Sequence, residues 1–85
     1  MKEESPLPTI TLNGAQRTLA SGVTVAELVS ELTRRPIDSD GHATDGTRLG
    51  VAVARNAAVV PRSKWSSTLL AADDDIEIVT AVQGG

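Results

Sequence analysis

The predicted fold rests first on one segment, Gly22-Val23-Thr24-Val25-Ala26-Glu27-Leu28-Val29-Ser30-Glu31-Leu32. Its start has the capping-box spacing, in which the Thr24 hydroxyl accepts from an amide of the first helical turn and the Glu27 carboxylate accepts from the amide of Thr24. Apolar residues then recur at the helical period on one stripe, made of Val25, Leu28, Val29 and Leu32. Because Pro36 disfavours helical backbone at Arg35, the helix is expected to end there.

Two short strands are predicted before this helix. Residues 9–12 alternate polar and apolar side chains with a period of two, and Asn13-Gly14 readily takes the positive φ angles of a type I′ hairpin turn. The return strand, residues 15–20, has a weaker pattern with Ala15, Arg17 and Leu19 on one face. Such a strand is typical of the edge of a sheet.

Three more strands are predicted after the helix. Residues 49–55 alternate in a way that fits a strand inside a sheet with both faces covered. After a turn at Asn56-Ala57, a short strand at Val59-Val60 is ended by Pro61, which has no amide hydrogen to donate. The last strand, residues 76–82, places on one face Ile76 and Ile78, and on the other Glu77, Val79 and Ala81. This order predicts an α+β domain with two antiparallel hairpins and one helix on a single face of the sheet.

Trp65 is the sole aromatic side chain of the chain. It could cap the aliphatic core or anchor a partner protein, and the core role is favoured because an indole buries a large area. Leu69 and Leu70 are expected to pack with it. The run Asp73–Asp75 is predicted to be a solvated acidic turn, as most short charge runs are.

The polar loop from Ile37 to Arg48 also allows two interpretations. It holds the acidic residues Asp38, Asp40 and Asp45 and the single histidine, His42, which together could bind a metal ion. Their spacing lacks the ligand order and the closing glutamate of an EF-hand. A solvated, mobile insertion is therefore the favoured interpretation.

Length, charge and composition narrow the possible functions. With 85 residues, the chain forms one small domain, which disfavours a large enzyme pocket. A net charge of −3 disfavours a nucleic-acid partner. The absence of cysteine excludes disulfides, thiolate metal sites and a cysteine nucleophile. No signal peptide and no apolar run of roughly 18 residues is present, so we expect a soluble, cytoplasmic protein with no membrane partner.

The sequence ends in Gln83-Gly84-Gly85, and this end is the candidate reactive site. We expect residues 1–8 to form a flexible tail, residues 9–82 the folded domain, and residues 83–85 a mobile C-terminal tail. Two residues without a Cβ atom make a narrow peptide that could enter a partner's channel, led by the α-carboxylate. Because a carboxylate is unreactive toward sulfur until it is adenylated, a partner enzyme would have to activate it. In a chain without cysteine, sulfur could be carried covalently only there, as a thiocarboxylate.

From about residue 9 to residue 85, the chain resembles the ThiS family of sulfur carriers in thiamine biosynthesis. The most specific parts of this resemblance are Val60-Pro61-Arg62-Ser63-Lys64-Trp65 and the terminal Gly-Gly. The resemblance implies a β-grasp, ubiquitin-like fold, with a mixed sheet of four to five strands packed against one main helix and a flexible Gly-Gly tail. It also implies that the last strand runs parallel to the first at the centre of the sheet.

The resemblance further implies a carrier that is not an enzyme and binds no cofactor or metal. Gly85 would be adenylated with ATP by a ThiF-like E1 adenylyltransferase and converted to a thiocarboxylate with sulfur from a cysteine desulfurase or sulfurtransferase. A ThiG-like thiazole synthase would then take the sulfur for thiazole formation. Gly84 and Gln83 would enter the partner with Gly85, and Val79 and Val82 would form the docking surface.

Three alternatives stay open at this stage. The same chemistry could serve molybdopterin synthesis, as in MoaD-like carriers, or cysteine synthesis. Gly85 could instead be joined to lysines, as in a ubiquitin-like protein modifier, or the domain could be an interaction module whose glycines are incidental. The long loop of residues 37–48 and the Asp73–Asp75 turn depart from the compact members of the family, which leaves partner specificity open.

Overall fold

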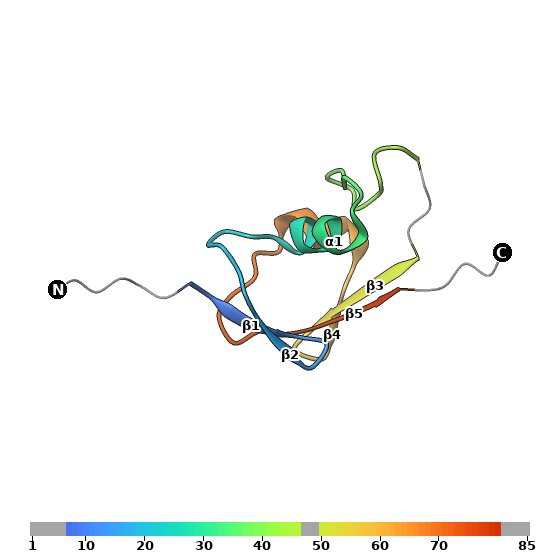
Figure 1. Cartoon of the computed structure of the whole chain (residues 1–85). Helices are drawn as coiled ribbons and strands as arrows, with labels where there is room; N and C mark the ends of the chain where they lie inside the picture. Colours follow the sequence, from blue (N-terminus) through green and yellow to red (C-terminus); the bar gives the residue numbers. More distant parts are fainter. Residues whose placement is uncertain (1–6, 47–49, 81–85) are drawn as a thin grey trace.

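The computed structural model describes residues 7–46 and 50–80. One α-helix and a short 3₁₀ helix lie over one face of a five-stranded sheet (Figure 1). In chain order the elements are β1 (Thr9–Leu12), β2 (Ala15–Thr18), α1 (Val25–Thr33), β3 (Val51–Arg55), β4 (Ala58–Val60), η1 (Arg62–Ser67) and β5 (Asp75–Thr80).

The last strand lies at the centre of the sheet, whose order is β2-β1-β5-β3-β4. β5 is parallel to β1, with Leu12 opposite Ile76, and antiparallel to β3, with Val53 opposite Ile78. The two hairpins are antiparallel, and β2 occupies an edge. These features confirm the predicted α+β arrangement, including the parallel pairing of the first and last strands.

Two strand predictions need correction. β2 ends at Thr18 instead of extending to residue 20, and Leu19 turns into the core, its amide donating to the Pro8 carbonyl at 2.8 Å. The prediction that both faces of β3 are covered is wrong. Its Val53 side is buried under the helices, whereas Ala52 on the opposite side is exposed, because both helices lie on one face of the sheet.

The capping box of α1 is formed as predicted. Thr24 Oγ1 accepts from the Glu27 amide at 3.1 Å, and Glu27 Oε1 accepts from the Thr24 amide at 2.9 Å. Val25, Leu28 and Val29 are fully buried, and Ala26 is buried beside them. Leu32, which was predicted to share this buried stripe, is instead 40% exposed. It lies in the last turn of the helix, two residues before Arg34, whose backbone is in the left-handed region.

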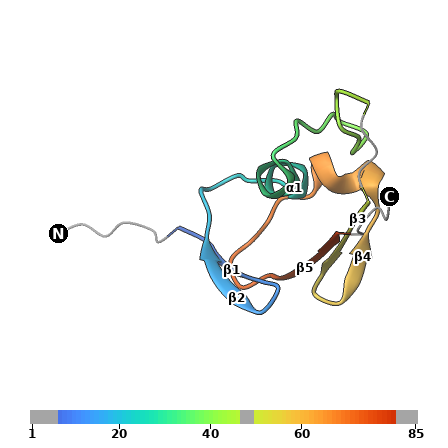
Figure 2. The ribbon, with the colours of Figure 1, turned by 45° about the vertical axis from the view of Figure 1, so that its right-hand side comes forward.

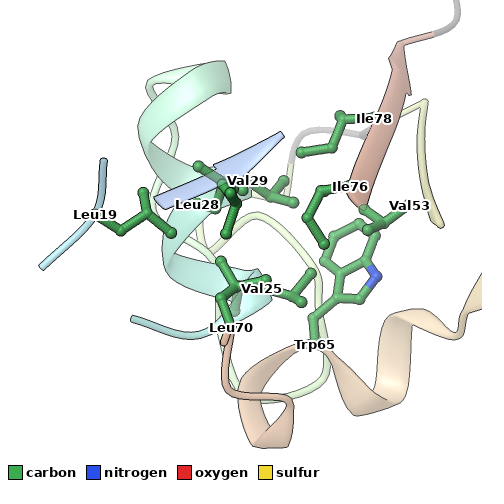
Figure 3. Close-up of a cluster of buried hydrophobic side chains, with 11 residues drawn as sticks. Leu19, Val25, Leu28, Val29, Val53, Trp65, Leu70, Ile76 and Ile78 are labelled. Carbon is green, nitrogen blue, oxygen red and sulfur yellow. The ribbon is translucent and has the colours of Figure 1, made fainter. Parts of the chain in front are cut away.

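The core lies between α1, η1 and the sheet, and Trp65 belongs to it (Figure 3). Trp65 is buried, and its indole Nε1 donates to the Val60 carbonyl at 3.0 Å, which confirms its predicted core role. Leu70 packs in the same cluster, whereas Leu69 is 58% exposed, so only one of the two leucines behaves as predicted. Neighbouring residues of an extended segment point in opposite directions, which explains the difference.

The loop after α1 is folded against η1 where the structure describes it. Arg62 donates to the Gly41 carbonyl at 3.0 Å and to the Val51 carbonyl at 3.1 Å, and its guanidinium lies over the Trp65 ring at 4.6 Å. Ala43 is buried and forms a bridge with Ile37. Gly41 and Ala43 are buried, contrary to the prediction of a fully solvated loop, whereas most of residues 37–46 are exposed as predicted. The predicted mobility of the loop stays a prediction.

The acidic turn before β5 contains a buried carboxylate, contrary to the prediction that it is solvated. Asp74 is only 5% exposed. Its carboxylate accepts from Arg55 Nε at 2.9 Å, from Asn56 Nδ2 at 3.1 Å and from the Ala71 amide at 2.9 Å. Asp73, in contrast, is exposed. Asp74 and Asp75 thus connect the start of β5 to Arg55 and Asn56 of the β3–β4 hairpin.

Burial by itself raises the pKa of Asp74, but the hydrogen bonds from the Ala71 amide, Asn56 and Arg55 outweigh it, so the pKa lies below its usual value. A carboxyl with a lowered pKa in the folded state stabilises the fold at pH values above the pKa of the unfolded chain, about 3.9. That contribution is lost as the pH falls through the lower pKa of the folded state.

We predict that Asp74→Asn lowers the free energy of unfolding at pH 7 by about 1–3 kcal/mol, because charge-assisted hydrogen bonds are lost. Its stability should also fall less steeply than that of the wild type as the pH drops below about 4. Urea unfolding at pH 7 and pH 3, followed by circular dichroism, measures both effects. Asp73→Asn is the matched control, and an equal loss in the two variants would contradict the prediction.

The β3–β4 turn contains an alanine in an unfavourable conformation. Asn56 has a φ of 52° and Ala57 a φ of 72°. Asparagine tolerates this left-handed region, whereas the Cβ atom of alanine is crowded in it. The turn therefore stores local strain at Ala57.

We predict that Ala57→Gly raises the free energy of unfolding by about 0.5–1 kcal/mol, because glycine takes a positive φ without this crowding. The urea midpoint should rise at an unchanged slope. Ala58→Gly, one residue later in β4, should have the opposite effect, since glycine weakens a strand. A lower midpoint for Ala57→Gly would show that the turn is not strained.

Candidate functional site

The candidate reactive end of the chain follows the central strand. β5 lies between β1 and β3 (Figure 2), and its last residue, Thr80, pairs with Val51 at the start of β3. The predicted site residues Val82, Gln83, Gly84 and Gly85 lie outside the described residues. The structure therefore describes the strand that leads to the predicted site, up to five positions before Gly85.

The face of the sheet opposite α1 carries an apolar patch on β3, β4 and β5, which consists of Ala52, Ala54, Val59 and Val79. The exposed Glu77 of β5 lies opposite Ala54 on the same face and borders this patch. Val79 is 64% exposed and lies opposite Ala52, while Val59 is 78% exposed and lies opposite Ala54. The predicted placement of Val79 on the face opposite Ile76 and Ile78 is confirmed, and the side chain is exposed there. Its role in docking stays a prediction.

The β1–β2 half of the same face is polar. Its side chains are those of Thr9, Thr11, Gln16 and Thr18, in cross-strand pairs. The apolar patch thus occupies the half of the face that borders the end of β5. At the β4 edge of the sheet, a hollow of about 280 Å³ is lined in part by Val59, Arg55 and Lys64. An apolar area with a polar border is typical of a protein-binding surface.

Two asparagines at hairpin turns hold the backbone of β5. Asn13 Nδ2 donates to the Ile78 carbonyl at 3.2 Å, and its Oδ1 accepts from the Ile78 amide at 2.9 Å. At the start of the strand, the Asn56 amide donates to the Asp75 carbonyl at 2.7 Å, and Asn56 Oδ1 accepts from the Asp75 amide at 2.9 Å. From the sequence, both residues were predicted only to form turns. Their additional role is to bind the backbone of β5. The signal that could have indicated it is that both left-handed turn positions hold asparagine, whose side chain readily binds backbone groups.

The loop residues that were considered as metal ligands are not brought together. Asp38 Oδ1 accepts from the His42 amide at 3.0 Å and from the Asp40 amide at 2.9 Å, while Asp45 forms an ion pair with Arg35 at 3.3 Å. The hydrogen bond from the His42 amide is the main cause that lowers the pKa of Asp38. Among residues 7–46 and 50–80, no three His, Cys, Asp or Glu side chains form a group that could hold a metal ion.

Within the described ranges, α1 and η1 are the two helices, and neither has the length and apolar character needed to cross a membrane.

The arrangement of these elements is that of a β-grasp domain. A mixed sheet has the last strand parallel to the first at its centre, and one main helix covers one face. This confirms the expected fold class.

The ThiS family model matches residues 10–85, and the chain belongs to this family. The chain is also similar to the crystal structure of the thiamine biosynthesis protein ThiS from Geobacter metallireducens, with a TM-score of 0.62 and 25% sequence identity. The similarity covers 91% of this chain and 99% of that one. A comparison with curated proteins gives no match. The family and the structural similarity support a role as a small carrier protein in thiamine biosynthesis.

Proposed function

We propose that this chain is a cytoplasmic sulfur carrier that supplies sulfur for thiazole formation in thiamine biosynthesis, with Gly85 as the residue that carries it. The observation that carries the proposal is the match of the ThiS family model, which extends through the terminal Gly84-Gly85. The central position of β5 supports it, because the strand that leads to this terminus is held on both sides.

The proposed chemistry takes place on the C-terminal carboxylate. A carboxylate oxygen of Gly85 attacks the α-phosphorus of ATP, pyrophosphate leaves, and an acyl adenylate forms. The outer sulfur of a persulfide on a cysteine desulfurase or sulfurtransferase then displaces AMP and forms an acyl disulfide. A second thiol cleaves its S–S bond, which leaves the thiocarboxylate on Gly85 and a disulfide between that thiol and the donor cysteine. The chain supplies the carboxylate and the docking surface, while a ThiF-like adenylating enzyme and a ThiG-like thiazole synthase supply the catalytic groups.

We propose that the apolar patch contacts these partner enzymes. Its largest exposed side chains are those of Val59 and Val79, and Val79 immediately precedes Thr80 at the end of β5. A partner that covers the patch would hold the domain while Gln83, Gly84 and Gly85 enter its active site. Val82 was assigned to the same docking surface from the sequence and is included in this proposal.

The proposal predicts that one oxygen at Gly85 is replaced by sulfur when the chain is incubated with a ThiF-like enzyme, ATP and a sulfur source. Intact mass followed by fragmentation of the C-terminal peptide measures this replacement. A chain lacking Gly84 and Gly85 is the control and should keep its mass. Attachment of Gly85 to lysines would favour a protein modifier, and an unchanged mass with an enzyme that is active on a known carrier would contradict the proposal.

We further predict that Val79→Asp weakens binding to the adenylating enzyme by roughly tenfold or more, because an unpaired charge would be placed at an apolar contact. Binding can be measured by titration calorimetry, with thermal unfolding as a check on the fold. Gln16→Asp adds the same charge to the polar half of the same face and is the matched control. Equal affinities for the two variants would exclude the apolar patch from the interface.

A further inference from the structure

The β1 side of β5 loses its backbone partner halfway along the strand. The backbone pairing of β1 with β5 reaches Leu12 opposite Ile76, and the last bond of this ladder runs from the Asn13 amide to the Ile76 carbonyl at 2.9 Å. At Asn13 the chain turns into the β1–β2 hairpin with a φ of 50°. Beyond Ile76, therefore, no residue of β1 continues beside β5.

The side chain of Asn13 takes the place of the missing strand. Its carboxamide offers one donor and one acceptor, spaced as in a peptide group, and both are used by the backbone of Ile78. Successive residues of a strand direct their N–H and C=O groups to opposite sides. The polar backbone groups of Ile78 therefore face Asn13, and those of its two neighbours face β3. Asn13 thus extends the β1 side of the sheet by two residues toward the C-terminus.

We propose that Asn13 is a positioning residue for the C-terminal reaction: by binding Ile78 it anchors the end of β5, from which Gly85 is presented to the adenylating enzyme. The inference rests on the proposed function. Asn13 touches neither ATP nor the reacting carboxylate in this scheme, so its effect passes through the backbone of β5.

An anchored strand end makes binding easier without changing the chemistry. If Ile78 were released on the β1 side, the end of β5 would sample more conformations, and the partner would have to order it during binding. The expected effect is a higher KM for the carrier at an unchanged kcat. Ordering one additional residue corresponds to a rise in KM of roughly tenfold.

Asn13→Gly tests the anchor because glycine accepts the same positive φ and keeps the backbone amide that binds Ile76. The matched control is Asn56→Gly. It also removes an asparagine side chain from a left-handed hairpin position and loses a hydrogen bond to β5, but at the start of the strand, on Asp75. Each variant loses two side-chain hydrogen bonds, and one of those lost in Asn56→Gly is made to the buried carboxylate of Asp74, so its stability should fall at least as far.

The first measurement is hydrogen exchange of the Ile78 amide by NMR, which needs no partner. Exchange should be faster by roughly tenfold or more in Asn13→Gly than in the wild type, because this amide loses its acceptor. In Asn56→Gly, exchange of the Ile78 amide should become faster only as far as the whole domain is destabilised. The exchange rate of the Ile76 amide in the same variant measures that loss of global stability. If the ratio of Ile78 to Ile76 amide exchange in Asn13→Gly were the same as in the wild type, the inference that Asn13 anchors β5 would be refuted.

The second measurement is the steady-state rate of ATP–pyrophosphate exchange by the adenylating enzyme, at a temperature where all three chains are folded. A raised KM with an unchanged kcat in Asn13→Gly, and wild-type values in Asn56→Gly, would support the positioning role. Equal KM values for the two variants would reduce Asn13 to a structural residue and overturn the inference. Failure of the wild type itself to support exchange would instead refute the proposed function, and faster Ile78 exchange would still establish the anchor.

Discussion

The parallel pairing of β5 with β1 is the interaction on which the rest of this structure depends. It joins the two hairpins, because β5 is the only described strand that contacts both β1 and β3. It also places Ile76 and Ile78 beneath α1, where they complete the core with Trp65. Since the candidate reactive glycines follow this same strand, the element that closes the fold also leads to the proposed site.

How much of the fold could be predicted depends on how far apart the interacting residues lie in the sequence. The capping box of α1 joins residues three positions apart, and the hairpin turn at Asn13-Gly14 is equally local, so both were predicted. The partners of Asp74 include Arg55, 19 residues away, and Asn13 binds Ile78 across 65 residues. No local pattern reveals such pairs, and the buried carboxylate and the second role of Asn13 were therefore missed.

The candidate site was predictable to a similar degree. The period of two along β5 correctly placed Val79 on the face opposite the core, because alternation is a property of every strand. The extension of the apolar patch to Val59 depends on the register of β3 and β4, which the sequence does not show. The packing of the loop of residues 37–46 against Arg62 was not predictable either. It requires glycine at position 41, because a Cβ atom there would lie 2.3 Å from Arg62 Cγ.

The central position of β5 also has a consequence for the order in which the domain can fold. During synthesis β5 leaves the ribosome after the other described elements. Its neighbours β1 and β3 cannot join into one sheet before it emerges, because β5 lies between them. Until then each hairpin is a two-stranded unit, which is marginally stable in water. The nascent chain is therefore expected to stay open until β5 emerges, so that the sheet is completed only after every other described element has been made.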